Sequence, residues 1–118
     1  MKIIEVKDQI EGGKVAFDIL KETLKEGAQT LGLATGSSPL EFYKQIRESD
    51  LDLSNLISVN LDEYKGLSSD NNQSYHYFMK KHLFDMVNIN QEKTYVPNGL
   101  EPDLKKACEE YNSIINDL

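Results

Sequence analysis

The strongest constraint on the fold is the alternation of short apolar segments with longer segments whose apolar residues recur at helical spacing. The short segments cover residues 3–6, 30–34, 56–61 and 94–96, and the helical ones cover approximately residues 8–26, 39–49, 74–87 and 104–118. Strands that alternate with helices are joined by right-handed crossovers in a parallel sheet. The sequence therefore predicts an α/β fold, a three-layer parallel sheet with helices on both faces, and a single α/β domain over residues 1–118.

Composition excludes several classes of protein. The 118 residues carry 13 Lys and Arg against 20 Asp and Glu, a net charge of −7, so nothing favours nucleic acid as a partner. No apolar run approaches the roughly 18 residues of a membrane span, which argues against a membrane partner. The single cysteine, Cys108, excludes an internal disulfide and favours a reducing, cytoplasmic compartment; it lies on the apolar stripe of the last helix and is predicted to be a core residue.

The last predicted helix ends at Leu118, on an apolar position of its stripe. A helix with such a stripe normally packs against a sheet that continues, so we expect the chain to be the amino-terminal part of a longer protein. Apolar surface left open on this helix and on the sheet edge favours self-association into a homo-oligomer.

The segment Thr35-Gly36-Ser37-Ser38 joins a predicted strand to a predicted helix. Ser38 is a suitable helix N-cap, and Glu41 three residues later completes a capping box. Backbone N–H groups and hydroxyls at such a turn suit an anion such as a phosphate monoester. The pattern of a nucleotide P-loop and that of a dinucleotide fingerprint are both absent. A plain turn whose serine only caps the helix stays an alternative.

Asp62 and Glu63 directly follow the next predicted strand. Ligands of parallel sheets bind outside the carboxyl ends of the strands, so we expect these acids at the same edge as residues 35–38. A half-shielded aspartate there is suited to act as a general base. A solvated strand end is the alternative. A metal site has less support, because His76 and His82 lie six residues apart, on nearly opposite faces of one predicted helix.

Taken together, three segments resemble the amino-terminal half of the glucosamine-6-phosphate deaminase family. They are Leu31-Gly32-Leu33-Ala34-Thr35-Gly36-Ser37-Ser38-Pro39-Leu40, Asn60-Leu61-Asp62-Glu63-Tyr64-Lys65-Gly66-Leu67 and Gln73-Ser74-Tyr75-His76-Tyr77-Phe78-Met79. The resemblance covers essentially all of the chain. The pairing of the Asp-Glu-Tyr-x-Gly-Leu segment with the downstream Ser-Tyr-x-x-Phe-Met is its most specific part.

The resemblance implies a fold of the deaminase/6-phosphogluconolactonase type and a small phosphosugar, glucosamine 6-phosphate, as substrate. It implies that Thr35, Gly36, Ser37 and Ser38 bind the phosphate, and that Asp62 is the catalytic residue that moves a proton from C2 to C1 of the ring-opened sugar. No metal or organic cofactor is implied. The family's ring-opening histidine segment has no match in this chain, so we expect the 118-residue polypeptide alone to have little or no turnover.

Three other functions stay open. A module that binds or senses a phosphosugar without catalysis would keep the anion loop, and a 6-phosphogluconolactonase-like hydrolase would share the fold. A phospho-acceptor receiver domain fits less well, because it needs an acidic pair after the first strand, whereas Glu5 lies within that predicted strand.

Overall fold

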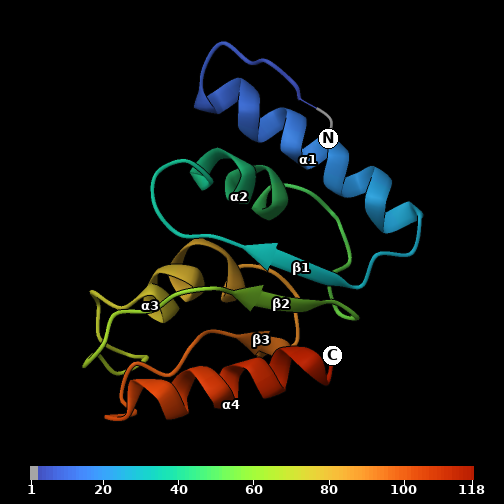
Figure 1. The fold of residues 1–118 in the computed structure, drawn as a ribbon. Coiled ribbons are helices and arrows are strands. Elements are labelled where there is room, and N and C mark those ends of the chain that lie inside the picture. The colour runs from blue at the N-terminus through green and yellow to red at the C-terminus, as the bar shows by residue number, and fades with distance from the viewer. Residues whose placement is uncertain (1–2) are drawn as a thin grey trace.

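Three parallel strands in the order β1-β2-β3 form the sheet of the structure, a computed structural model that describes residues 3–118 (Figure 1). The strands are β1 (Thr30–Leu33), β2 (Ile57–Asn60) and β3 (Thr94–Tyr95). Leu33 is paired with Asn60, and Val59 is paired with Tyr95. The carboxyl ends of all three strands therefore reach the same edge of the sheet, as predicted.

Helices alternate with these strands along the chain. They are α1 (Gln9–Lys25), α2 (Leu40–Arg47), α3 (Tyr75–Met79), which continues as a π-helix over Lys80–Phe84, a 3-10 turn over Gln91–Lys93, and α4 (Leu104–Asn116). The four predicted helical segments are confirmed, with ends that differ by a few residues.

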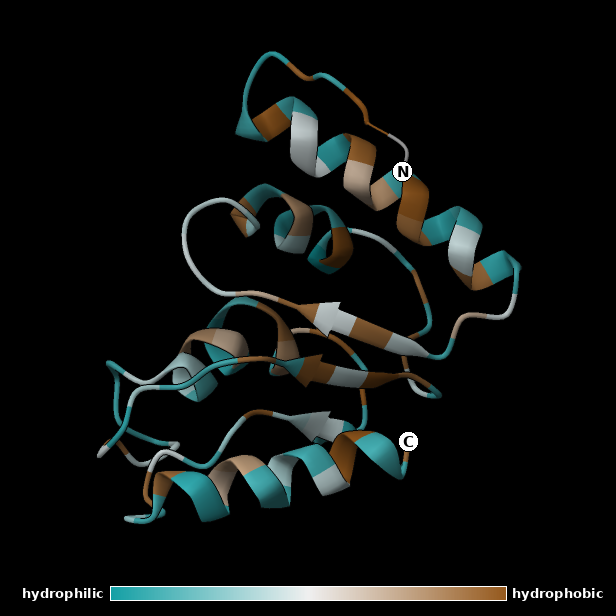
Figure 2. Ribbon diagram, viewed as in Figure 1, coloured by the Kyte–Doolittle hydropathy of each residue, from teal (hydrophilic) through white to brown (hydrophobic). Residues whose placement is uncertain are grey.

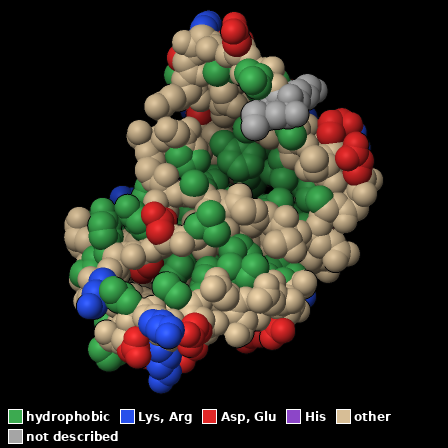
Figure 3. Space-filling view, in the orientation of Figure 1, with side chains coloured by type: hydrophobic (Ala, Val, Ile, Leu, Met, Phe, Trp, Pro, Cys, Tyr) green, Lys and Arg blue, Asp and Glu red, His purple; other side chains and the backbone are tan. Residues whose placement is uncertain are grey.

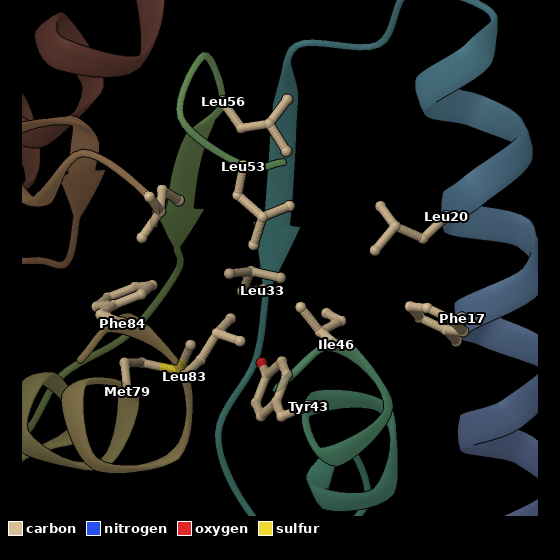
Figure 4. Packing of buried hydrophobic residues seen from close by; sticks show 11 residues of the cluster. Phe17, Leu20, Leu33, Tyr43, Ile46, Leu53, Leu56, Met79, Leu83 and Phe84 are labelled. Carbon is tan, nitrogen blue, oxygen red and sulfur yellow. The ribbon is translucent and has the colours of Figure 1, made fainter. Parts of the chain in front are cut away.

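The main hydrophobic core lies between one face of the sheet and the helices α1, α2 and α3 with its π-helical extension (Figure 4). Its largest fully buried side chains are Tyr43, Phe84, Ile46, Leu53, Met79 and Leu83. The α1–α2 contact is very close at Gly13, because a Cβ added there would lie 2.7 Å from the backbone nitrogen of Phe42. The Gly12–Gly13 pair thus lies within a continuous helix, where Gly13 lets α2 approach.

Helix α4 contributes no residue to this core and runs beside β3 (Figure 1). It is anchored by Tyr111, whose hydroxyl lies 2.5 Å from the carbonyl oxygen of Asn60 and 2.8 Å from that of Tyr95. Burial is the main cause that raises the pKa of Tyr111 to about 12. Figure 2 shows that the central strands are largely hydrophobic, whereas α4 is mostly hydrophilic.

Two predictions about packing are wrong. Residues 3–6 form no strand, and Ile3 is 80% exposed. An apolar run becomes a strand only where a neighbour supplies the hydrogen-bonding ladder, and this segment pairs with neither β1 nor any other described strand. Cys108 is exposed rather than a core residue, because α4 buries little of its apolar stripe in this structure.

Candidate active site

The turn that was predicted to bind an anion follows β1 directly. Gly36 has a φ of +95°, which an L-residue adopts only with strain, and Gly36, Ser37 and Ser38 are exposed. The start of the turn is fixed by Tyr43 of α2, whose buried hydroxyl contacts both backbone polar atoms of Ala34. Burial raises the pKa of Tyr43 to about 12, so this phenol stays protonated and able to donate.

The predicted capping box at the start of α2 does not form. Pro39 occupies the N-cap position, and no side chain caps the helix there. Proline lacks the N–H group and its ring fixes φ, so it begins the helix without help from Ser38. The capping role that the alternative gave to Ser38 is therefore wrong, whereas the choice between an anion-binding turn and a plain connection stays open.

Asp62 follows β2 as Thr35 follows β1. Leu33 and Asn60 are paired across the sheet, and Thr35 and Asp62 each lie two residues beyond this pair. Neighbouring strands are about 4.8 Å apart, so the two connecting segments leave the sheet side by side. The expected half-shielding of Asp62 is not seen, because its side chain is exposed.

Both carboxylate oxygens of Glu63 accept hydrogen bonds from backbone N–H groups. One carboxylate oxygen accepts from the backbone N–H of Tyr75 at 2.7 Å and from that of Tyr64 at 2.8 Å. The other oxygen accepts from the backbone N–H of His76 at 2.9 Å. The two acids after β2 thus differ: Glu63 closes the first turn of α3, whereas Asp62 is exposed to solvent.

Tyr75 is the first residue of α3 and packs beside the segment that follows β2. Its ring lies against that of Tyr64, with 4.6 Å between the ring centroids. A hydrogen bond with the Tyr64 hydroxyl is the main cause that raises the pKa of Tyr75, and the negative charge of Asp62 acts in the same direction. A hydrogen bond with the Thr35 side chain opposes this effect. The Tyr75 ring therefore lies against the segment that follows β2 and carries Asp62.

An open cleft of about 310 Å³ lies between the segment after β2, the turn after β3 and α4. Its lining residues include Asp62 and Lys65 after β2, Asn98 and Gly99 in the turn after β3, and Cys108 and Tyr111 on α4. The space-filling view shows hydrophobic side chains gathered over the middle of the molecule and charged ones toward its periphery (Figure 3). The cleft combines an apolar wall with a carboxylate at its rim.

Neither histidine supports a metal site. Within residues 3–118, no group of three or more His, Cys, Asp or Glu side chains could hold a metal ion. His82 packs against the ring of Phe78 at 4.4 Å. Burial is the main cause that lowers the pKa of His76, which favours its neutral form at pH 7. Over the same residues, no helix is long and apolar enough to cross a membrane.

The roles of Glu63 and Tyr75 were not identified from the sequence. Glu63 accepts hydrogen bonds from Tyr75 and His76, which lie 12 and 13 residues further along the chain. No local capping pattern covers such a separation. The available signal was an acid at a strand end followed by a segment with Ser74 as its helix cap, which accepts from the backbone N–H of Tyr77.

Comparison with solved structures defines the class of fold. The structure of a monomeric glucosamine-6-phosphate deaminase superposes with a TM-score of 0.93 and 35% identity, over 99% of this chain and 51% of that one. A 6-phosphogluconolactonase from Thermotoga maritima superposes with a TM-score of 0.76 and 20% identity, over 95% of this chain and 52% of that one. The chain therefore has the α/β fold that deaminases and 6-phosphogluconolactonases share, as predicted.

Sequence comparison then gives the family. Glucosamine-6-phosphate deaminase of Streptococcus pneumoniae serotype 4 is 59% identical over 117 residues, which are 99% of this chain and 49% of that protein. The enzyme of Streptococcus pneumoniae strain 70585 is 58% identical, also over 117 residues that make up 99% of this chain and 49% of that protein. No protein-family model matches the chain. Over almost its whole length the chain is therefore similar to the amino-terminal half of glucosamine-6-phosphate deaminases, and it spans about half the length of these curated relatives.

Proposed function

We propose that this chain supplies half of a glucosamine-6-phosphate deaminase, which converts glucosamine 6-phosphate to fructose 6-phosphate and ammonia. The observation that carries the proposal is the shared register of two segments: the turn of residues 35–38 and Asp62 leave the sheet from the paired residues Leu33 and Asn60. An anion site and a carboxylate base are thereby brought to one edge. The relatives at 59% identity support the same chemistry through their names.

The turn is the proposed phosphate site. Thr35, Ser37 and Ser38 offer hydroxyl donors, and the positive φ of Gly36 turns the backbone so that a ligand can approach it. A Cβ added at Gly36 would meet no heavy atom within 4 Å, so the turn is open on that side. A phosphate held here would fix one end of a sugar chain whose other end reaches toward the neighbouring segment.

Asp62 is the proposed proton carrier. In the ring-opened sugar, its carboxylate takes the proton from C2 and returns it at C1, so the aldose becomes a ketose-level intermediate. Addition of water at C2 and loss of the nitrogen then give the ketone of fructose 6-phosphate and ammonia. A carboxylate is a suitable base because it is ionised at neutral pH and the same oxygen can accept and return the proton. No step of this scheme requires a metal or an organic cofactor.

The test is an assay of ammonia and fructose 6-phosphate release by the full-length protein that contains this chain. Wild-type protein is expected to release the two products in equal amounts, and Asp62→Asn to lose most of that activity. Asp52→Asn is the matched control, because Asp52 makes hydrogen bonds to Ser54 and Asn88 before β2, away from the carboxyl edge. Binding of glucosamine 6-phosphate without product release would instead indicate a phosphosugar-binding module, and hydrolysis of 6-phosphogluconolactone would indicate the sister activity.

The 118-residue chain alone is proposed to have little or no turnover, because the family's ring-opening segment has no match in it. Incubating the isolated chain with glucosamine 6-phosphate and assaying ammonia tests this proposal. Turnover near that of the full-length protein would contradict it.

A further inference from the structure

We propose that the cleft between the start of α1, α2 and the π-helical turn after α3 is a second anion site, which binds a phosphate group through Lys44, Arg47 and His82. The cleft has a volume of about 430 Å³. The phosphate group is that of inorganic phosphate or of a small phosphate ester. The inference goes beyond the proposed deaminase reaction and does not depend on it.

The residues that line this cleft separate it from the proposed substrate site. Of the turn of residues 35–38, Ser37 lines it, whereas Thr35 and Ser38 line another cleft of about 570 Å³ between the starts of α1 and α2. Asp62 lines a third cleft, beside α4. An anion bound deep in the α2 cleft would therefore leave Asp62 and most of the turn accessible to substrate.

Arg47 is held in place from the opposite wall of the cleft. Its Nη1 donates to the backbone carbonyl oxygen of His82 at 2.9 Å. The last carbonyl groups of a helix lack partners within the helix, so this bond joins α2 to the end of the π-helical turn. A guanidinium carries several N–H donors in one plane, and the remaining ones suit a phosphate. Within residues 3–118, Arg47 forms no ion pair with a carboxylate.

Lys44 supplies a second positive charge on the same side of α2. It lies three residues before Arg47, and residues at this spacing are neighbours on a helix surface. Lys44 is exposed and, over the described part of the chain, forms no ion pair either. Among the described residues that line the cleft, Glu41 carries the only carboxylate. Two permanent cations thus face one anion here, although the whole chain has a net charge of −7.

The third group of the cleft is His82, which lies in the π-helical turn Lys80–Phe84. Turns of this kind are rare and occur frequently at functional sites. The His82 ring packs against that of Phe78, with 4.4 Å between the ring centroids. Burial is the main cause that lowers the pKa of His82, and the positive charges of Lys81 and Arg47 act in the same direction. A phosphate dianion beside the ring would oppose this effect and favour its protonated form.

The first test follows the His82 ring of the full-length protein by NMR as a function of pH, with and without inorganic phosphate. The His82→Gln variant assigns the signal. Phosphate is expected to raise the pKa of His82, because a nearby negative charge stabilises the imidazolium. Sodium chloride at the same ionic strength should have a smaller effect, since screening acts on all charges alike. An equal response to both salts would overturn the proposal.

The second test compares phosphate affinity in charge variants by calorimetry. Lys44→Gln should weaken binding about threefold to tenfold, because it removes one charged donor from an exposed position. Lys105→Gln on α4 is the matched control; it removes the same charge outside the cleft and should leave the affinity unchanged. Arg47→Gln should also weaken binding. Wild-type affinity in that variant would mean that Arg47 only caps the π-helical turn, which contradicts the proposal.

Steady-state kinetics with glucosamine 6-phosphate distinguish a second site from an extension of the substrate site. In the absence of phosphate, Lys44→Gln should keep the kcat and KM of the wild type. A KM raised as much as the phosphate affinity is weakened would place Lys44 in the substrate site and overturn the inference. Wild-type phosphate affinity in Lys44→Gln would overturn it as well.

Titration with glucose 6-phosphate distinguishes the two sources of the phosphate group. Tighter binding of this ester than of inorganic phosphate, weakened by Lys44→Gln, supports a site for a phosphate ester. The reverse order, with the same dependence on Lys44, supports a site for free phosphate. Absence of ammonia release by the wild-type protein would refute the proposed function alone, because the anion site is measured by binding.

Discussion

At the amino edge of the sheet, Gly27 precedes β1 and Asp52 precedes β2; at the carboxyl edge, Gly36 follows β1 and Glu63 follows β2. The two glycines have nearly the same φ, +96° and +95°, and both lie in open space. The two carboxylates both accept backbone N–H groups and connect their strand to a distant segment, Asn88 in one case and α3 in the other. Both edges thus contain a glycine at positive φ and a carboxylate that accepts backbone N–H groups.

The two edges differ in which polar side chains make hydrogen bonds within the fold. At the amino edge, Gly27 ends α1 and Asp52 bonds Ser54 and Asn88. At the carboxyl edge, Ser38 does not cap α2 and Asp62 stays exposed beside the braced Glu63. A glycine turn or a carboxylate brace is therefore no sign of function by itself. The side chains to test for a role in binding or catalysis are those that do not stabilise the fold, such as Ser38 and Asp62.

The largest expected difference is that between the two aspartates that flank β2, Asp52 and Asp62. Asp62→Asn in the full-length protein is expected to lower kcat about 10²- to 10⁴-fold, the usual contribution of a general base, with little change in stability. Asp52→Asn should leave kcat as it is. Ammonia release at saturating substrate measures both. Equal kcat in the two variants would remove Asp62 from the proposed proton transfer.

Next in size is the close approach that holds the carboxyl edge together. Gly99→Ala places a Cβ 2.2 Å from the Tyr64 carbonyl oxygen and should cost about 1–3 kcal/mol of unfolding free energy, as overpacking does. Gly32→Ala in β1 is the control, since a Cβ there meets nothing within 4 Å. Urea unfolding of both variants compares them. Equal stability of the two would show that the 62–67 segment can move away from the β3 turn.

A smaller effect is expected from the paired glycines. Gly27→Ala and Gly36→Ala should each cost about 1–2 kcal/mol of stability, because alanine is strained at positive φ. Only Gly36→Ala should also raise KM for glucosamine 6-phosphate, by several-fold, since the strained turn can no longer present its hydroxyls. Thermal unfolding and steady-state kinetics measure the two effects. A raised KM in Gly27→Ala would break the distinction between the edges.

The smallest expected effect is the pH dependence of the stability that Asp52 provides at the amino edge. Hydrogen bonds from the Ser54 side chain, the Ser54 backbone and Asn88 lower the pKa of Asp52 below that of an ordinary aspartate. A lowered pKa in the folded state stabilises the protein above the unfolded-state pKa, and this stability is lost as pH falls through the folded-state pKa. The thermal midpoints of wild type and Asp52→Asn should therefore differ at pH 6, and this difference should shrink as the pH falls below 3.8, the ordinary pKa of an aspartate. A constant difference over this range would contradict the assignment.

Much of the fold follows from the sequence because the pattern is local. The run 30–34 and the run 56–61 became β1 and β2, since each is short, apolar and bounded by polar turns. The run 3–6 is also short and, apart from Glu5, apolar, yet it forms no strand, because pairing depends on a neighbour that local composition does not encode. Cys108 was misplaced for a related reason: a helical stripe shows which face is apolar, and only packing shows whether that face is covered.

The candidate site was predictable in part. Strand order places residues 35–38 and Asp62 at one edge before any coordinates are known, and the register of Leu33 with Asn60 agrees with that expectation. The functional roles of these residues stay predictions, as do a homo-oligomer and the single-domain boundary at residues 1–118. The contacts of Glu63 and Tyr75 were out of reach, because they join segments whose separation is set by the loop of residues 65–72.

The phenol of Tyr43 sets where β1 stops. The Tyr43 hydroxyl, from the following helix, bonds to both the backbone N–H and the carbonyl oxygen of Ala34. These bonds take the place of the next inter-strand hydrogen bonds of the sheet. The strand's length is therefore decided within ten residues of chain, independently of what lies along its other side. The turn that follows can change its residues, and with them its ligand, without shifting the alignment of the strands beneath it.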